Sequence, residues 1–530
     1  MALIDRCKSL LFVLVLGGVT SGAALAQTIY HRGNDADPET LDPHKTSTVA
    51  EANLVRDLYE GLVIHNGQGR VVPGAAESWT VSADGKVYTF KLRASGKWSN
   101  GAAVTAKDFV FSFRRIVDPK TGAKYASIIY PIAGAERINT GKAPVETLGV
   151  KAVDDRTLEI TLENATPYFL ELLTHQTPSP VNEASVSALG ADFIKAGNLV
   201  SNGAYMLKEN LPNTLITLVK NPHFHDAANV RIDQVNYIPI KDTAAGVRRF
   251  IAGEILSMND IPADQLKALR TQLGSQVNVA PLLGTYYIAF NTKKPPFDDK
   301  RVRTALAMAV DREVLSEEIW AGTLVPAYSF VPPGTANYGN PGAVAWQDQS
   351  VIEREETARK LLAEAGFGPS NPLKVELRYN VTDNNKATAV ALAGDWKRIG
   401  VDTSFISTDA KTHFAFLREK GAYDIARAGW IADYNDPQNF LFLFEGGNGG
   451  LNYPSWAHAK YDALMKSAAR ELNLAARAGI LREAETLLLA EAPVAPLLFY
   501  TNRILISPKL SGFTPNLRGA NATRFMSIRN

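Results

Sequence analysis

The residues best suited to chemistry lie in one segment, Asp424-Ile-Ala-Arg-Ala-Gly-Trp-Ile-Ala-Asp-Tyr-Asn-Asp-Pro437. Its first half is apolar and strand-like, so successive side chains point to opposite faces. Asp424 and Arg427 then lie on opposite faces and cannot neutralise each other. An unpaired guanidinium in an apolar run is costly, so Arg427 needs a carboxylate from the protein or from a ligand. Asp433 needs a cation for the same reason, and a free peptide carries both charges, one at each end.

The elements that must position this segment alternate between strands and helices. Apolar side chains at every second position predict strands, and apolar side chains at helical spacing predict helices. The predicted strands are residues 88–92, 158–162, 283–290 and 373–379, and the predicted helices are residues 302–314, 353–365 and 472–492. The chain shows no internal repeat and no low-complexity tract. This pattern predicts a mixed α/β protein.

Other short motifs accompany the segment in a characteristic order along the chain. They are Leu41-Asp-Pro-His-Lys45, Arg56-Asp-Leu-Tyr-Glu-Gly-Leu62, Pro73-Gly-Ala-Ala-Glu-Ser-Trp79, Tyr88-Thr-Phe-Lys-Leu-Arg93, Lys97-Trp-Ser-Asn-Gly101, Asn202-Gly-Ala-Tyr205 and Arg301-Val-Arg-Thr-Ala-Leu306. Together with residues 427–437 they resemble the periplasmic oligopeptide-binding proteins of ABC importers, in the peptide/nickel family of extracellular solute-binding proteins. The resemblance covers nearly the whole chain after the N-terminal region.

The resemblance implies an α/β fold with two lobes, the type II periplasmic-binding-protein fold, with an additional small inserted domain. The chain would cross between the bodies near Tyr59, Asn182, Gly284 and Tyr500. Lobe I would contain residues 27–59, 183–284 and 500–530, the small domain residues 60–182, and lobe II residues 285–499. The implied function is to capture short peptides between the lobes and deliver them to a permease in the inner membrane, which works with cytoplasmic ATPase subunits.

The resemblance also implies roles for three charged residues. Asp433 matches the position that binds the α-amino group of the peptide, and Arg427 and Arg418 match positions that hold a ligand carboxylate. Each has a structural alternative: Asp433 could cap its own loop, since Asx turns are common beside Asn and Pro. Arg427 could form an inter-lobe salt bridge, and Arg418, in Phe416-Leu-Arg-Glu-Lys420, could face water at the end of a helix.

Several aromatic residues could line pockets for the side chains of a peptide, because they combine apolar area with hydrogen-bonding groups. They are Trp430, Tyr434, Tyr125, Tyr286 and Tyr287. The alternative is ordinary packing in the core or between lobes, and we expect it for one or two of them.

The chain departs from its relatives at three positions. It has Asn385 where they often have histidine, Ile431 where they have cysteine, and Ala289 where they have glutamate. Asn385 remains a candidate for peptide contact. The loss of the histidine and the glutamate leaves the preferred peptide length and the carboxylate site open.

The N-terminal residues 1–26 have the pattern of a cleavable signal peptide. Arg6 and Lys8 precede an apolar run from Leu10 to Val19, and Ala24-Leu-Ala26 provides small residues for cleavage. The apolar run is shorter than the roughly 20 residues that a membrane span needs. We therefore expect a periplasmic protein.

Composition limits the partners and cofactors. Cys7 is the one cysteine and lies before the apolar run, so neither a disulfide nor a thiolate metal site is expected in the exported protein. The formal net charge of +2 gives no reason to expect nucleic acid or an anionic surface as a partner. We expect a monomer that binds short peptides without a metal or cofactor.

Three alternatives remain. An exported hydrolase is disfavoured, because Gly-x-Ser-x-Gly and His-Glu-x-x-His motifs and a catalytic cysteine are missing, so we expect no enzyme and no catalytic residues. A nickel or other small-solute carrier would have to use His223-Phe-His225 with Asp226, a poor ligand set. A murein peptide is the main alternative among peptides, since its extra carboxylates could use both Arg418 and Arg427.

Overall fold

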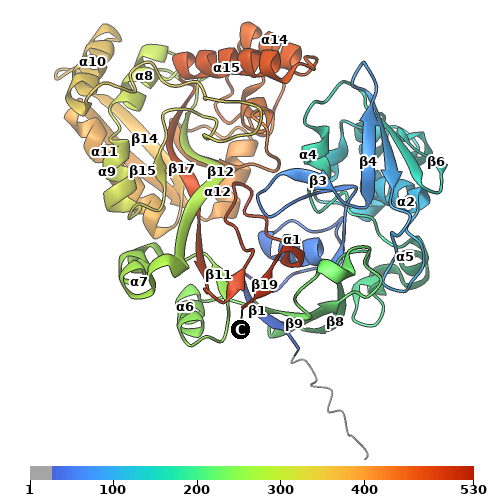
Figure 1. Ribbon diagram of the computed structural model, residues 1–530. Helices are drawn as coiled ribbons and strands as arrows, with labels where there is room; N and C mark the ends of the chain where they lie inside the picture. The colour runs from blue at the N-terminus through green and yellow to red at the C-terminus, as the bar shows by residue number, and fades with distance from the viewer. Residues whose placement is uncertain (1–26, 530) are drawn as a thin grey trace, which may run out of the picture.

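The computed structural model describes residues 27–529, and its centre is one mixed β-sheet that extends through two lobes (Figure 1). The predicted signal peptide lies outside the described residues. In sheet order the strands are β15 (Val401–Thr408), β14 (Leu373–Asn380), β16 (Ile425–Ile431), β12 (Val277–Phe290), β17 (Val494–Ile506), β11 (Ser257–Asn259), β1 (Ile29–Asn34), β10 (Gln234–Pro239), β9 (Leu215–Lys220) and β8 (Tyr205–Leu211), with β13 (Val325–Pro326) beside β17.

Two long antiparallel strands, β12 and β17, connect the lobes. Their ladder breaks register between Pro281 and Thr285, which divides each strand into two parts. Beyond the break, β12 pairs with β16 from Gly284 to Phe290. At the other end, residues 504–506 of β17 pair with β11. The same two strands therefore contribute to the cores of both lobes.

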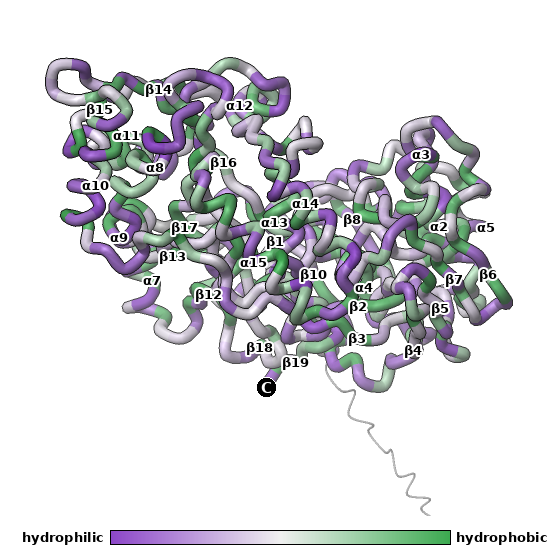
Figure 2. The backbone as a smooth tube through the Cα atoms, turned by 90° about the horizontal axis from the view of Figure 1, so that it is seen from above, coloured by the Kyte–Doolittle hydropathy of each residue, from purple (hydrophilic) through white to green (hydrophobic). Residues whose placement is uncertain are grey.

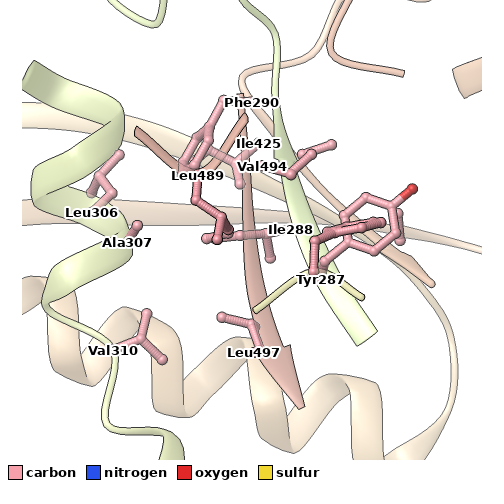
Figure 3. Packing of buried hydrophobic residues seen from close by; sticks show 14 of the residues in the cluster. Tyr287, Ile288, Phe290, Leu306, Ala307, Val310, Ile425, Leu489, Val494 and Leu497 are labelled. Atoms are coloured by element: carbon pink, nitrogen blue, oxygen red, sulfur yellow. The ribbon is translucent and has the colours of Figure 1, made fainter. Parts of the chain in front are cut away.

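The larger lobe surrounds the part of the sheet formed by β12 to β17. Its helices are α8 (Lys300–Met308), α9 (Arg312–Val314), α10 (Val351–Glu364), α11 (Asp383–Arg398), α12 (Ala410–Arg418), α13 (Gln438–Leu441), α14 (Ala459–Ala468) and α15 (Leu474–Glu491). Figure 3 shows how Ile288 and Phe290 from β12 face Leu489 and Leu497 in its core. This core supports one wall of the cavities described below.

The second lobe is built on β1 and β8 to β11. Its helices are α1 (Val49–Leu58), α5 (Glu183–Leu189), α6 (Thr243–Ile251) and α7 (Leu266–Leu273). Thr48 begins α1 with a capping box, in which its hydroxyl accepts from the Glu51 N–H and the Glu51 carboxylate accepts from the Thr48 N–H. The C-terminal strands β18 (Leu510–Ser511) and β19 (Ser527–Ile528) pair with each other, and Leu510 and Met526 pack in the same core.

A small domain has its own four-stranded antiparallel sheet and its own hydrophobic core. The sheet order is β4 (Ala76–Val81), β5 (Val87–Leu92), β7 (Thr157–Thr161) and β6 (Val150–Asp154), and the other elements are β2 (Val63–His65), β3 (Val71–Pro73), α2 (Ala106–Val117), α3 (Ala135–Asn139) and α4 (Phe169–Leu173). Seen from above in Figure 2, this domain and helices α8 to α12 lie on opposite sides of the molecule.

Contacts fasten the small domain to both neighbours. Arg115 on α2 forms a bidentate ion pair with Asp42, with N–O distances of 3.0 and 2.7 Å. On the other side Tyr434, from the loop after β16, belongs to the core of the small domain and stacks on Tyr168 at 5.3 Å. The small domain is therefore part of the wall that carries the candidate residues.

Most predicted elements are confirmed, including the strands around Phe90, Leu158 and Leu377 and the helices α10 and α15. The single helix predicted for residues 302–314 is wrong. The α8 helix ends at Met308, and α9 begins separately because the Asp311 side chain accepts from the Val314 N–H as an N-cap. Within residues 27–529, no helix has the length and apolar character needed to cross a membrane.

Candidate functional site

The candidate residues meet at a cavity of about 680 Å³ between the small domain and the larger lobe. The small domain contributes residues from Lys124 to Leu172, and the larger lobe contributes residues of β16 and the loop after it. Five of the predicted residues line this cavity. They are Tyr125, Arg427, Trp430, Asp433 and Tyr434.

A second cavity, of about 570 Å³, opens toward the lobe built on β1. Its walls include the start of α1, the middle of β17 and the loop that carries Arg518. Tyr125, Ile431 and Asp433 line both cavities. Asp433 therefore stands where the two cavities meet.

The β16 strand presents an unpaired edge to the first cavity. On one side β12 pairs with all of residues 425–431, whereas β14 on the other side pairs only with Ile425 and Ala426. Gly429 is required where the strand passes Tyr500, because a Cβ at this position would lie 2.5 Å from the Tyr500 hydroxyl. An extended peptide can add to such an edge through main-chain hydrogen bonds.

The Arg427 side chain rests on neutral groups. Its guanidinium donates to Asn380 Oδ1 at 3.0 Å and to the Tyr500 hydroxyl at 2.7 Å, and it lies over the Tyr286 ring at 4.5 Å. Its Nε is buried without a hydrogen bond. No ion pair involves Arg427 within residues 27–529, so the inter-lobe salt bridge considered above is not formed in this structure. The cation is left available for a carboxylate that enters the cavity.

The Asp433 carboxylate makes no hydrogen bond or ion pair with another described residue. Burial raises its pKa, and the positive charge of Arg518 lowers it in part. The loop is capped by another residue, Asp436, which accepts from the Gln438 N–H at 2.9 Å and pairs with Arg477 at 2.7 and 2.8 Å. Asp433 is thus free to face the cavities.

Two groups hold the backbone around Asp433. Asn439 Oδ1 accepts from the Trp430 indole N–H at 2.9 Å and from the Asp433 N–H at 3.1 Å. Arg518 donates to the Asp433 carbonyl at 2.6 Å and to the Ala432 carbonyl. These contacts fix the loop by its main chain and leave the carboxylate unengaged.

The aromatic candidates divide into cavity and core residues. Trp430 contacts Phe442 edge-to-face at 5.9 Å and lines the first cavity. Tyr286 and Tyr287 are 1% exposed and line neither cavity. Figure 3 shows Tyr287 among the core side chains. Tyr286 acts behind Arg427, and its hydroxyl donates to Asn385 Oδ1 at 3.0 Å.

The structure places two other candidates away from the cavities. Asn385 is buried at the start of α11 and donates to the Asn380 carbonyl at 2.9 Å, so it supports the residue that holds Arg427. Arg418 is exposed at the end of α12 and lines neither cavity. The possible metal ligand His225 instead bonds Glu60 at 2.9 Å. No group of three metal-ligating side chains occurs in the described part of the chain.

Sequence reasoning missed five residues of the site: Asn380, Asn439, Tyr500, Arg56 and Arg518. Asn380, Asn439 and Tyr500 meet Arg427 and Trp430 only through the tertiary fold, so no local pattern marks them. The two arginines carried a weak signal. Both follow apolar residues, in Leu54-Val-Arg56 and in Asn516-Leu-Arg518, but only Arg518 lacks an acidic residue three or four positions away, since Glu60 follows Arg56 at that spacing.

The fold and the site agree with known proteins. Residues 70–452 match the family described as bacterial extracellular solute-binding proteins, family 5 Middle. The chain is 40% identical over 510 residues to the periplasmic oligopeptide-binding protein OppA of Escherichia coli, which covers 95% of this chain and 93% of that relative. It is 39% identical over 503 residues to the periplasmic murein peptide-binding protein MppA of Escherichia coli, covering 94% and 93%.

Solved structures lead to the same fold. The TM-score is 0.86, at 38% identity, to MppA in its unliganded open form, which covers 95% of this chain and 98% of that chain. It is 0.79 to another structure of MppA from Escherichia coli. It is 0.78, at 35% identity, to Haemophilus influenzae OppA in complex with RPPGFSPFR, covering 95% and 99%. The predicted two-lobed fold is confirmed, and the chain belongs to family 5 of the bacterial extracellular solute-binding proteins.

Proposed function

We propose that this protein is the substrate-binding component of a peptide ABC importer, and that it binds short peptides in the cleft formed by the two cavities. The observation that carries the proposal is the pair of unneutralised charges, Asp433 and Arg427, at the two ends of the unpaired edge of β16. The names of OppA and MppA, which describe peptide-binding proteins, support the same conclusion.

In the proposed complex the peptide lies along β16 as an added strand. Its ammonium group pairs with Asp433, and its main chain runs back toward Arg427, which takes a carboxylate. The contacts use groups that all peptides share, so binding needs no particular side chain. Trp430 and Tyr125 would supply apolar surface to whatever side chains are present.

The ion pair between Asp433 and the peptide's ammonium becomes stronger when the cleft closes, because closure excludes water. At an effective dielectric of about 20, an ammonium about 4 Å from the carboxylate contributes roughly 4 kcal/mol before desolvation, compared with about 1 kcal/mol in water. The proposal therefore includes closure of the lobes over the peptide.

Isothermal titration calorimetry tests the role of Asp433. We expect the ligand-free protein to bind Ala-Ala-Ala, and Asp433→Asn to weaken that binding by roughly 2 to 5 kcal/mol, because the ammonium loses its partner in a dry site. Acetylating the peptide's amino group should cause a similar loss in the unmodified protein and little further loss in the variant.

The matched control is Asp260→Asn, which removes a carboxylate of the same cleft that is paired with Arg503. This control should leave the affinity for Ala-Ala-Ala unchanged. If Asp433→Asn bound the peptide as tightly as the unmodified protein does, the proposed site would be wrong.

The proposed location is the periplasm, where a signal peptide at residues 1–26 would deliver the protein as a monomer. The proposed partners are a permease in the inner membrane and its cytoplasmic ATPase subunits. We also propose the domain boundaries predicted above, with lobe changes near Tyr59, Asn182, Gly284 and Tyr500. The separate hydrophobic cores of the small domain and of the larger lobe support them.

A murein peptide is the second candidate ligand. The likeness to MppA, at 39% identity and a TM-score of 0.86, favours it. Competition between a murein tripeptide and Ala-Ala-Ala for the same protein would distinguish a wall-peptide carrier from a general one. We further propose that the protein does not hydrolyse what it binds, and mass spectrometry of peptides after incubation would reveal any cleavage products.

A further inference from the structure

We propose that the second cavity is a subsite for an acidic side chain on the first residue of the bound peptide, with Arg56 as its main contact. This inference rests on the proposed function, because it takes the peptide's ammonium to be at Asp433. It adds a preference to a site that otherwise recognises features common to all peptides.

The Arg56 guanidinium has no protein partner. It lines the second cavity from α1, and none of the hydrogen bonds or ion pairs of residues 27–529 involves it. Asp57 contributes the weakest of the charge interactions that act on it, and this carboxylate is already bonded to Tyr237 at 2.7 Å and to the Thr523 N–H at 2.8 Å. Five donors of a rigid guanidinium are therefore left for a ligand.

The surroundings of Arg56 disfavour the charged form of its side chain. Burial, and then the positive charge of Arg518, lower the pKa of Arg56 to about 10. The same two arginines also help to lower the pKa of the neighbouring His175 to about 3, after burial as the main cause. A partly buried cation of this kind is stabilised most by an anion that brings its own hydrogen-bond acceptors.

Peptide binding itself changes the charge balance of the cavity. Without a ligand, Arg56, Arg503 and Arg518 face three carboxylates, those of Asp35, Asp260 and Asp433. Arg503 is paired with Asp260, and the peptide's ammonium would neutralise Asp433. Arg56 and Arg518 are then opposed by Asp35 alone, so the occupied cleft has room for one more negative charge.

Geometry assigns that charge to the first residue of the peptide. Asp433 lies where the cavities meet, and the main chain leaves it along β16 through the first cavity. The side chain on the carbon next to the ammonium is the part of the peptide that can enter the second cavity. A carboxylate on the third residue would instead lie near Arg427.

The test compares three tripeptides by isothermal titration calorimetry on protein freed of ligand by unfolding and refolding. The peptides are Glu-Ala-Ala, its neutral isostere Gln-Ala-Ala, and Ala-Ala-Glu. We expect Glu-Ala-Ala to bind about tenfold more tightly than Gln-Ala-Ala, since a hydrogen bond between charged groups contributes that much. The preference should shrink in high salt.

In Arg56→Gln we expect the preference for Glu over Gln to vanish while Gln-Ala-Ala binds as before, which also shows that the variant is folded. Arg56→Lys should keep part of the preference, because the charge remains without the planar donors. Arg249→Gln on α6 is the control and should keep the preference, since it removes a cation of the same lobe that lies outside the cavity and pairs with Glu254.

The outcomes separate the two proposals. Equal affinities for Glu-Ala-Ala and Gln-Ala-Ala in the unmodified protein, or a preference that survives Arg56→Gln, would overturn the acidic subsite and leave the peptide site standing. Tighter binding of Ala-Ala-Glu, with no difference between Glu-Ala-Ala and Gln-Ala-Ala, would also overturn it. If none of the three peptides binds, the proposed function fails and this inference fails with it.

Discussion

At the scale of single residues, the charges of Arg427 and Asp433 are left available to a ligand in different ways. Arg427 is surrounded by an amide oxygen, a hydroxyl and an aromatic ring, which position the guanidinium without neutralising it. Asp433 is held through its backbone by Asn439 and Arg518, and its carboxylate is left without a partner. Both arrangements carry a desolvation cost that a peptide with two charged ends would relieve.

Arg518 predicts how peptide affinity depends on pH. Asp433 can pair with an ammonium only when ionised, so affinity should fall as the pH drops through its pKa, which burial places above the ordinary value. The positive charge of Arg518 opposes this rise. In Arg518→Gln the pKa of Asp433 should be higher still, and the loss of affinity for Ala-Ala-Ala should begin at a higher pH.

Calorimetry between pH 4 and 8 measures this shift, with Arg503→Gln as the control for removing an arginine from the same cavity. The control should follow the unmodified protein. Identical pH profiles for Arg518→Gln and the unmodified protein would show that Arg518 does not act on Asp433.

The individual residues were predictable to the extent that their environment is local. Asp433 and Arg427 could be singled out because an apolar strand and its loop gave each of them no partner within the segment. Tyr286 and Tyr287 could not be placed in the same way, because alternation puts them on opposite faces of β12 and both faces are buried. Arg418 is exposed at the end of α12, and the role that the resemblance implies for it stays a prediction.

At the scale of elements, α15 binds the loop between β13 and α10, residues 327–350, through the buried carboxylate of Glu485. Glu485 accepts from the N–H groups of Phe330, Val331 and Gly342 at 2.7 to 2.9 Å, and from the Tyr338 hydroxyl at 2.6 Å. Burial raises the pKa of Glu485 to about 7 despite these four donors. The strength of the contact between this loop and α15 should therefore depend on pH, through protonation of Glu485.

Glu485→Gln should destabilise the protein by roughly 1 to 3 kcal/mol, because the amide nitrogen would face donors that need an acceptor. The variant should also lose a pH dependence. In the unmodified protein, folded Glu485 keeps a proton that the unfolded chain has released, so the free energy of unfolding should fall between pH 4.5 and about 7.

Urea unfolding at pH 5 and pH 7.5 measures both effects. Glu483→Gln on the same helix is the control, since Glu483 is half-exposed and pairs with Lys460 at 2.8 Å at the surface. If the difference in stability between the two pH values were the same in Glu485→Gln and in the unmodified protein, the carboxylate would not be its source.

Elements with a clear period were predicted well, and their junctions were not. The strand at 373–379 and the helix at 353–365 have uninterrupted patterns, and the structure has them within a few residues. The break between α8 and α9 was missed because Val310 and Val314 continue the helical spacing across it. An N-cap such as Asp311 competes with continuation of the helix, and only packing decides between them.

At the scale of the whole molecule, β12 and β17 determine how the lobes can move. Both strands pass from one lobe into the other, and their pairing is interrupted between Pro281 and Thr285. The backbone is similar to MppA in its unliganded open form. A rotation of the lobes would therefore bend these strands near the interruption while the pairing on either side is retained.

Small-angle X-ray scattering with and without Ala-Ala-Ala should show a smaller radius of gyration in the peptide complex. The reason is that a peptide with two charged ends would contact groups from both walls of the cleft and favour the closed arrangement. Asp433→Asn at the same peptide concentration should keep the larger radius. Unchanged scattering on saturation of the unmodified protein would contradict closure.

The discontinuous architecture could not have been predicted from periodicity. Strands that neighbour each other in the sheet, such as β1, β11 and β17, are separated by hundreds of residues in the chain. Local patterns give strands but not their partners, and the resemblance to known proteins supplied the division into lobes but no strand order. The core of the small domain is a second example. Residue 434 joins it from far along the chain, and no local pattern could indicate that contact.

One peptide bond joins two residues with separate tasks. Asp433 lines both cavities, and Tyr434, directly after it, lines the first cavity and also packs into the core of the small domain, where it stacks on Tyr168. Because these two residues are adjacent in the chain, repacking around the Tyr434 ring would also shift the Asp433 carboxylate. Ligand preference in this architecture can therefore change through mutations in the core of the small domain that contact no part of the ligand.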